Sequence, residues 1–282
     1  LGHGVEGATE VVHIEAGDDD SAAFICEAIT DAHDIGSKEL GFVDAHSHFP
    51  GSGVAAAGVV DLNSPPIGSV KKLADLVEKL SGQAAKEPKG DWVRGLGYDD
   101  TLLAEGRHPT RVDLDKVSTT LPVFALHTSG HLGAVNSAGL AILGIDENTP
   151  DPPGGVIRRE EGSNTPNGVL EEKALDEVNA IASKFSVTES MAIAQAATDD
   201  YLSQGVTTAQ SGLTSETLAK GLATLGTLGQ LRVRLVVWPD ELLATSMLNG
   251  SVIFEESKAF LSFGAVKLIA DGSIQGYTGY LS

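Results

Sequence analysis

Two histidines at the end of a short apolar run have a spacing that suits a metal ion. The run is "GFVDAHSHF", residues 41–49, in which one residue separates His46 from His48. In an extended strand alternate side chains point the same way, so Asp44, His46 and His48 would share one face. Zinc binds neutral imidazole nitrogen at about 2.0–2.1 Å, and a catalytic site keeps one position open for water or substrate. The spacing alone also fits two polar residues where a strand runs out, because eight histidines in 282 residues produce such a pair by chance roughly 0.2 times.

A lysine near the other end of the sequence stands in a predicted strand. Lys267 lies in "AVKLIADGS", residues 265–273, which is typical of a buried strand. A free ammonium is costly at the end of such a strand, and neutralisation or conversion to an anionic ligand relieves that cost. The alternative is a lysine that extends to solvent at the rim or pairs with Asp271.

The elements that must position these residues alternate regularly in the last third of the chain. Apolar strands separated by single helices indicate crossover units and a buried parallel sheet. The predicted strands are residues 206–211, 232–238 and 265–273, and the predicted helices are residues 188–205, 215–228 and 239–248.

The middle of the chain has a different pattern. Apolar residues at three-and-four spacing predict an amphipathic helix from Ser69 to about residue 83. "DWVRGLGYDD" and "LPVFALHTSGH" (residues 91–100 and 121–131) read as strands that end in polar loops. The proline- and glycine-rich residues 146–168 predict a surface loop or hairpin. Residues 170–185 read as a helix.

Composition narrows the classes of partner and compartment. The chain has 282 residues and is 41% apolar, enough for one large domain or two ordinary ones. Its 19 basic and 39 acidic residues give a formal charge of −20, which disfavours nucleic acid and anionic membranes as partners. Cys26 is the single cysteine, so an intrachain disulfide is excluded and a cytoplasmic location is expected. Neither a membrane span nor a signal peptide is visible, although a chain that opens on Leu1 need not include its true start.

Several segments in order resemble the amidohydrolase superfamily, in particular its amidohydrolase 3 branch with the formamide deformylase-like enzymes. The matching segments are "GFVDAHSHF", "WVRGLGYDD", "HPTRVDLDKVS", "PVFALHTSGHLGAVNSAGLAILGI", "TPDPPGGVIRR", "GVTTAQSG" and "VKLIADGSIQGYTG". The resemblance implies an α/β fold, a distorted TIM (β/α)8 barrel of the metal-dependent hydrolase type. It also implies one or two divalent metal ions, zinc first, and metal-activated water that hydrolyses an amide or related C–N bond of a small molecule. Imidazole ligands suit iron and manganese as well.

The resemblance assigns roles to individual residues. His46, His48 and Lys267 would be metal ligands, with Lys267 carboxylated to a carbamate. His127, His131 and Asp99 would face the substrate, as part of a region inserted between the first two barrel strands. An ordinary polar loop remains the alternative for these three, as it does for Asp100 beside Asp99. The catalytic aspartate of the family has no counterpart in this chain.

The resemblance also predicts a layout of four parts. Residues 1–40 would be a remnant of an amino-terminal β-sandwich or an irregular segment, 41–64 barrel strand 1, 65–190 the inserted substrate-covering subdomain, and 191–282 barrel strands 2–4. This is about half a barrel, whose other half would come from the rest of the chain or from another chain, including a homo-oligomer. A rival hypothesis is a non-catalytic remnant or interaction module that keeps half of the barrel. A sugar- or phosphate-binding barrel draws only on "DGSIQG", residues 271–276.

Overall fold

Two compact units make up the protein. The computed structural model describes residues 11–12, 26–27, 41–87, 91–182, 184–254, 260–269, 273 and 276–279. One unit, here the parallel-sheet unit, comprises Leu1–Ala56 and Val187–Leu268, and the other, the mixed-sheet unit, comprises Ala57–Ser186 and Ile269–Ser282. The predicted remnant at residues 1–40 lies outside the described residues apart from β1 (Val11–Val12) and β2 (Cys26–Glu27), which pair antiparallel.

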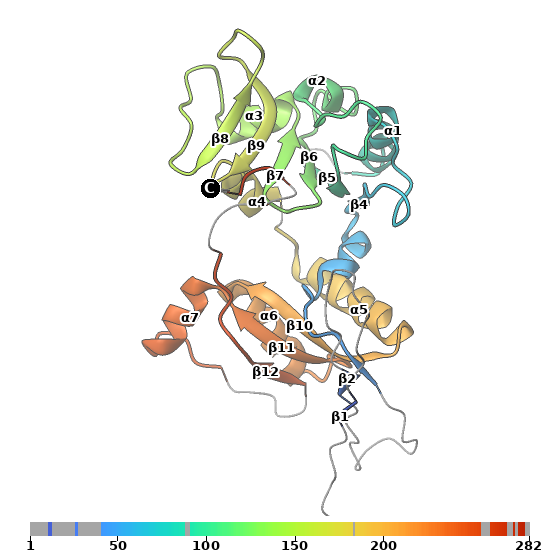
Figure 1. The fold of residues 1–282 in the computed structure, drawn as a ribbon, viewed down its shortest axis with the longest axis vertical. Coiled ribbons are helices and arrows are strands. Elements are labelled where there is room, and N and C mark those ends of the chain that lie inside the picture. Colours follow the sequence, from blue (N-terminus) through green and yellow to red (C-terminus); the bar gives the residue numbers. More distant parts are fainter. Residues whose placement is uncertain are drawn as a thin grey trace, which may run out of the picture. The chain divides into compact units, whose positions relative to one another are not determined.

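The parallel-sheet unit contains the strand and helix alternation that the sequence predicts. Its sheet has the order β12 (Leu261–Phe263), β11 (Arg234–Pro239), β10 (Val206–Thr214) and β3 (Phe42–Val43), and every neighbouring pair is parallel. Helix α5 (Val187–Ser203) precedes β10, α6 (Glu216–Thr227) connects β10 to β11, and α7 (Glu241–Leu248) follows β11 (Figure 1). Ser215 and Asp240 cap α6 and α7 by accepting a backbone N–H three residues on. The described strands form an open sheet of four and no closed barrel.

The last strand of this sheet is shorter and earlier than predicted. β12 is Leu261–Phe263, whereas the sequence predicts a strand over residues 265–273. The reason is a change of spacing along β11. The Gly264 N–H donates to the Val237 carbonyl at 2.8 Å, and the Lys267 N–H donates to the Pro239 carbonyl at 2.9 Å. The chain after β12 therefore advances by three residues, from 264 to 267, while β11 advances by two, from 237 to 239. The regular ladder ends there, yet the backbone of Lys267 is still held by β11.

The mixed-sheet unit has six strands in the order β4, β5, β6, β7, β9 and β8. β4 (Val60–Asp61), β5 (Val93–Tyr98) and β6 (Val123–His127) are parallel, whereas β6, β7 (Leu132–Val135), β9 (Pro166–Glu172) and β8 (Gly155–Arg159) are antiparallel neighbours. Its helices are α1 (Leu73–Ala84), α2 (Arg111–Leu114), α3 (Ser137–Leu143) and α4 (Asp176–Ala182), and the 3₁₀ helix η1 (Gly51–Ala57) ends where the unit begins. The predicted strands at β5 and β6, the hairpin β8–β9 and the amphipathic helix α1 are confirmed.

The helix predicted over residues 170–185 is wrong in its first part. Residues up to Glu172 belong to β9, and α4 begins only at Asp176. β9 pairs with β7 on one side and β8 on the other, and Leu170 in its middle is fully buried. Pairing on both edges outweighs the helical preference of the Leu-Glu-Glu sequence.

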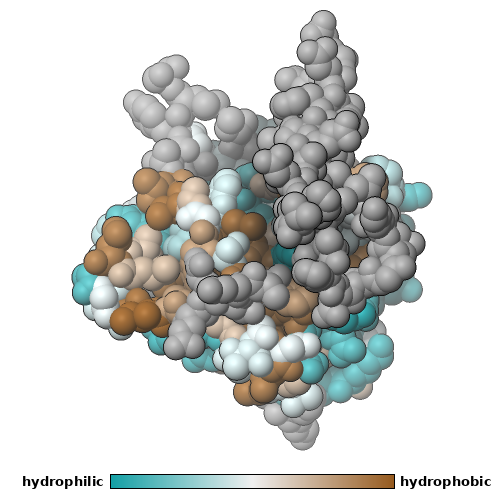
Figure 2. Space-filling model, turned by 90° about the horizontal axis from the view of Figure 1, so that it is seen from below, coloured by the Kyte–Doolittle hydropathy of each residue, from teal (hydrophilic) through white to brown (hydrophobic). Residues whose placement is uncertain are grey.

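Each unit has its own hydrophobic core. Two clusters of buried side chains fill the mixed-sheet unit, around Leu76 and Leu132 and around Phe124 and Leu170, and a third fills the parallel-sheet unit around Leu235. Apolar and polar residues are interspersed on the face shown in Figure 2, which is normal for a protein surface. In the part of the chain that the structure describes, we find no helix with the length and apolar character that crossing a membrane requires.

Candidate functional site

The segment after β3 carries His46 and His48, but not as a continued strand. β3 ends at Val43, so the prediction that Asp44, His46 and His48 share one strand face is wrong. The Asp44 Oδ1 accepts the His46 N–H at 3.2 Å, a local turn that takes the chain out of the ladder. The two histidines therefore sit on a turn at the carboxyl end of the first parallel strand.

Contacts with β10 nevertheless fix this turn. The Ser47 Oγ donates to the Gln210 carbonyl at 2.8 Å and accepts the Gln210 N–H at 3.1 Å. The Ser211 Oγ donates to the Phe49 carbonyl at 2.8 Å, and His48 itself forms a single antiparallel bridge with Ser211. Hydroxyl groups thus replace missing ladder bonds and hold the imidazoles in place.

The structure brings the three predicted metal ligands together. The ring centroids of His46 and His48 are 5.9 Å apart, and the Lys267 Nζ lies 3.2 Å from the His48 Nε2. Trp238, near the end of β11, packs its ring 6.1 Å from that of His46. These groups all lie at or just beyond the carboxyl ends of parallel strands, the edge at which α/β enzymes place their sites.

The electrostatics of this cluster suit a metal ligand. Burial lowers the pKa of His48, the Lys267 ammonium and His46 lower it further, and a backbone hydrogen bond with Gly212 opposes them. His48 is therefore neutral at neutral pH, the form in which imidazole binds metal. Two imidazoles and a convertible amine are a donor set that fits a zinc-like ion.

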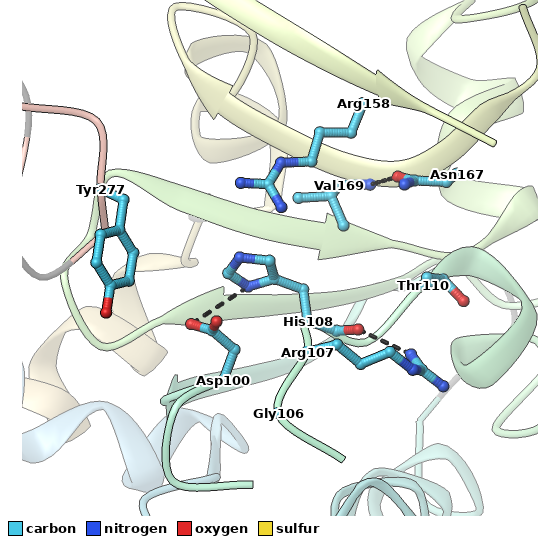
Figure 3. A pocket seen from close by; sticks show the side chains of 9 residues that line it. All are labelled: Asp100, Gly106, Arg107, His108, Thr110, Arg158, Asn167, Val169 and Tyr277. Atoms are coloured by element: carbon cyan, nitrogen blue, oxygen red, sulfur yellow. Dashed lines mark hydrogen bonds and ion pairs between the residues drawn. The ribbon is translucent and has the colours of Figure 1, made fainter. Parts of the chain in front are cut away.

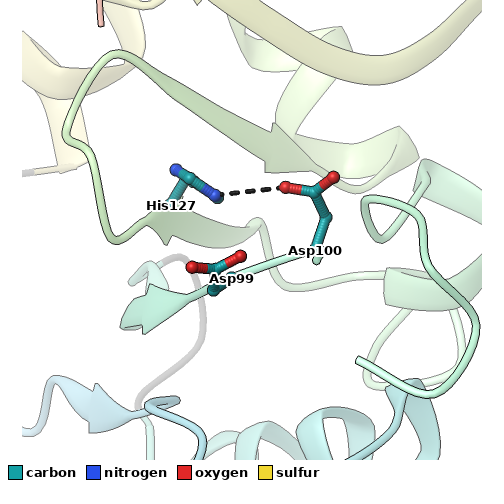
Figure 4. Close-up of side chains that lie close together, drawn as sticks. All are labelled: Asp99, Asp100 and His127. Carbon is teal, nitrogen blue, oxygen red and sulfur yellow. Dashed lines mark ion pairs between the residues drawn. The ribbon is translucent and has the colours of Figure 1, made fainter. Parts of the chain in front are cut away.

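A second cluster of polar side chains lies in the mixed-sheet unit, where β5 and β6 end. Asp99 and Asp100 directly follow β5, and His127 is the last residue of β6. Because these parallel strands pair Tyr98 with His127, the three side chains meet, with one ligand atom from each within 4.8 Å of the others (Figure 4). Gly97 makes the irregular strand end feasible, since its φ of +99° suits glycine and a Cβ there would lie 2.6 Å from the Asn63 side chain.

Three aromatic rings surround the acidic residues of this cluster. The fully buried His127 places its Nε2 3.2 Å from the Asp100 Oδ1. His108 places its Nδ1 3.7 Å from the same oxygen and 3.2 Å from the Tyr98 hydroxyl. Asp99 accepts the N–H and hydroxyl of Thr101 through its Oδ1.

Burial dominates the ionisation of these rings. It lowers the pKa of His127 although Asp100 and Asp99 raise it. It lowers the pKa of His108 to about 4, against the attraction of Asp100 and aided by Arg158. It raises the pKa of Tyr98, to which Asp100 adds. Both histidines are therefore neutral and Tyr98 is protonated at neutral pH.

A cavity of about 370 Å³ adjoins the cluster. Figure 3 shows Asp100 and His108 facing each other in its lining, with Arg158 and Tyr277 around the same space. The remaining lining residues are Gly106, Arg107, Thr110, Asn167 and Val169. The cavity therefore gives small solutes a path to the Asp100 carboxylate.

The residues predicted to face the substrate separate into two places. Asp99 and His127 lie in the buried cluster, whereas the Nδ1 of His131 lies 3.0 Å from the Glu172 carboxylate, in a pair that is about one quarter exposed. Their predicted contact with substrate stays a prediction. Asp100 and His108 complete the cluster. For Asp100 the sequence suggested an ordinary polar loop. Adjacent ends of parallel strands were a signal for Asp100, whereas nothing in the sequence singles out His108.

Comparison with known proteins decides the family. The amidohydrolase family profile matches residues 41–282. The chain belongs to the amidohydrolase family.

Two bacterial proteins are among the named relatives of this amidohydrolase-family chain. It is 32% identical to the N-substituted formamide deformylase of Arthrobacter pascens over 180 residues, which are 62% of this chain and 32% of that protein. It is 32% identical to the amidohydrolase YtcJ of Bacillus subtilis (strain 168) over 257 residues, which are 86% of this chain and 45% of that protein. The chain thus spans less than half the length of these relatives.

Two solved structures are similar in fold. A metal-dependent hydrolase from Pyrococcus horikoshii superposes with a TM-score of 0.57 at 22% identity, covering 84% of this chain and 44% of the other. One from Pyrococcus furiosus gives a TM-score of 0.54 at 26% identity, covering 84% and 45%. The α/β fold with its parallel and mixed sheets therefore resembles that of metal-dependent hydrolases.

Proposed function

We propose that the protein is a metal-dependent hydrolase that cleaves an amide or related C–N bond of a small molecule. His46, His48 and Lys267 would hold one or two divalent ions, zinc first. When bound, such an ion activates water and polarises the carbonyl group under attack. The observation that supports this proposal best is the 3.2 Å approach of the Lys267 Nζ to the His48 Nε2, beside His46 and beyond the parallel strands.

The chain's own residues would prepare this site in two ways. The Ser47 and Ser211 hydroxyls fix the turn that carries both imidazoles, so His46 and His48 need little reordering to bind. Lys267 would change from an ammonium cation to a carbamate monoanion when its nitrogen bonds the carbon of CO2 and two protons are released, one from the ammonium and one on formation of the carbamate. The carbamate would then supply anionic oxygen ligands where the ammonium would repel an ion.

The remaining parts of the proposal concern what surrounds the site. The four parallel strands would be about half of a barrel, completed by further chain or by another chain, including a second copy. The mixed-sheet unit would be the inserted subdomain, and His131, Asp99 and His127 would face the substrate unless they serve the ion site proposed below. A cytoplasmic location stays a prediction.

Metal content tests the proposal directly. Purified wild type should hold divalent ions, measured by plasma mass spectrometry. The double variant His46→Ala/His48→Ala and the single variant Lys267→Met should each lose at least one ion per chain, because the first removes two nitrogen ligands and the second removes the carbamate oxygen ligands. His131→Ala is the matched control, since it removes an imidazole outside both clusters.

A second measurement addresses the carbamate. Wild type equilibrated with 13C-labelled bicarbonate should show a carbamate carbon by NMR, and Lys267→Met should not. Unchanged metal content in the double variant would reject the assignment. It would favour a non-catalytic remnant or interaction module that keeps the family's fold.

A further inference from the structure

We propose that the mixed-sheet unit holds a divalent metal ion of its own, bound by Asp99, Asp100 and His127. One imidazole nitrogen with two carboxylates suits zinc, iron or manganese. This site uses none of the ligands proposed for the parallel-sheet unit, and it does not depend on the function proposed above.

The first argument is geometric. The His127 Nε2 and the Asp100 Oδ1 are 3.2 Å apart, and the three residues offer one ligand atom each within 4.8 Å of one another. Two ligands that share one tetrahedral ion at about 2.0–2.2 Å lie roughly 3.3 to 3.6 Å apart. A small adjustment of the Asp99 carboxylate therefore completes a three-ligand site with a position left open (Figure 4).

The second argument is an unmet need for a partner. The His127 side chain is 0% exposed, and its Nε2 and the Asp100 Oδ1 are buried with no well-formed hydrogen bond, their one close polar contact being with each other at 3.2 Å. A buried polar atom without a partner costs free energy, and nearly all such atoms in folded proteins have one. A cation between them satisfies the nitrogen lone pair and the carboxylate oxygen together.

The other nitrogen of the ring is already supported. The Ser129 Oγ lies 2.8 Å from the His127 Nδ1 and can accept a hydrogen bond from the Nδ1–H, a tautomer that leaves the Nε2 lone pair directed toward the carboxylates. The Ser129 N–H, 3.1 Å from the same nitrogen, favours the opposite tautomer when no ion is bound. Metal binding therefore requires that the ring proton moves from Nε2 to Nδ1, in addition to the adjustment of the Asp99 carboxylate.

Access comes from the cavity of about 370 Å³ that Asp100 lines (Figure 3). His108, whose Nδ1 is 3.7 Å from the Asp100 Oδ1, lines the same cavity and can orient that carboxylate. An ion can thus approach Asp100 from the cavity, although neither Asp99 nor His127 lines it.

The experiment uses the full chain with the other candidate site removed. In the His46→Ala/His48→Ala background, titration with Co2+ or Zn2+ alone should show one ion per chain, by the visible absorption of Co2+ and by calorimetry. Adding Asp100→Asn and His127→Gln should weaken binding at least about 100-fold, since two ligands are lost. Adding His131→Gln should leave it unchanged, as this histidine pairs with Glu172 instead.

A second readout guards against a variant that fails to fold. In the background variant, Zn2+ should slow hydrogen exchange at the ends of β5 and β6, residues 93–100 and 123–129, and chelator should reverse this. Absence of a bound ion in the background would overturn the proposal and leave an ion-free cluster of aspartates and histidines. So would an ion that protects other segments only. Either result leaves the test at His46 and His48 unaffected.

Discussion

At the scale of single residues, Asp113 shows what one buried carboxylate contributes. It is 5% exposed, and it accepts hydrogen bonds from Arg107 at 2.7 Å, from the Thr110 N–H and hydroxyl at 3.0 Å, and from Lys116 at 3.2 Å. Burial by itself raises the pKa of Asp113, but the hydrogen bonds from Arg107, Thr110 and Lys116 together bring it well below its ordinary value. The charged form is therefore the form that holds the start of α2.

Replacing Asp113 with Asn should lower the free energy of unfolding by about 1.5–3 kcal/mol at pH 7, because charge-assisted hydrogen bonds are lost. A folded-state pKa below the unfolded value of about 3.9 gives stability that is complete above that value. The stability is lost as pH falls further, toward the folded-state pKa. Urea denaturation at pH 7 and pH 3 should thus show a difference between wild type and variant that shrinks in acid. A difference that grows at pH 3 would contradict this.

Part of the candidate metal site was predictable from residue spacing, because spacing within one segment is a local property of the sequence. His46 and His48 share a turn two residues apart, and their proximity needs no knowledge of the fold. Lys267 joined them only through its resemblance to a family pattern. His108 could not be predicted, because it reaches Asp100 from an irregular segment whose path depends on packing.

At the scale of elements, Asn136 joins a helix to the strand beneath it. This fully buried side chain caps α3 by accepting the Gly139 N–H, and it also accepts the Val123 N–H at the start of β6. Its amide donates to the carbonyls of Ser118 and Leu121 at 2.8 and 2.9 Å. The side-chain oxygen of Asn136 thus accepts two hydrogen bonds and its amide nitrogen donates two, so no donor or acceptor of the side chain lacks a partner.

Asn136→Ala should destabilise the protein by about 2–4 kcal/mol, since it removes a helix cap and leaves four buried backbone groups without their hydrogen-bond partner. Thermal or urea unfolding followed by circular dichroism measures this. Asn164→Ala, at an exposed asparagine in the β8–β9 hairpin, should change stability by less than about 0.5 kcal/mol. Equal effects of the two substitutions would show that the hydrogen bonds of Asn136 carry no special weight.

Element types were predictable where periodicity is strong, and boundaries were not. The helix α1 follows its apolar spacing, with Leu73, Leu76 and Leu80 all buried. The misplaced elements β9 and β12 are those whose limits depend on pairing with strands distant in sequence. No local sequence pattern indicates that β9 pairs on both of its edges, or that the spacing shifts opposite Pro239.

At the scale of the whole molecule, separate cores imply separate responses to core damage. Leu170 and Leu235 are both almost fully buried, one in each unit. Leu170→Ala and Leu235→Ala should each cost about 2–5 kcal/mol through lost burial and the cavity left behind. Hydrogen exchange with mass spectrometry should show faster exchange mainly in the unit that contains the substitution. Equal acceleration in both units for both variants would mean that the two cores unfold as one.

The division of the chain between the units has a consequence for its connectivity. Backbone passes from one unit to the other at Ala56–Ala57, Ser186–Val187 and Leu268–Ile269. A protease that nicks the chain after Ser186 would produce two fragments, and each of them would supply part of both units. β3 on one fragment pairs with β10 on the other. The nicked halves would therefore stay associated until a denaturant separates them.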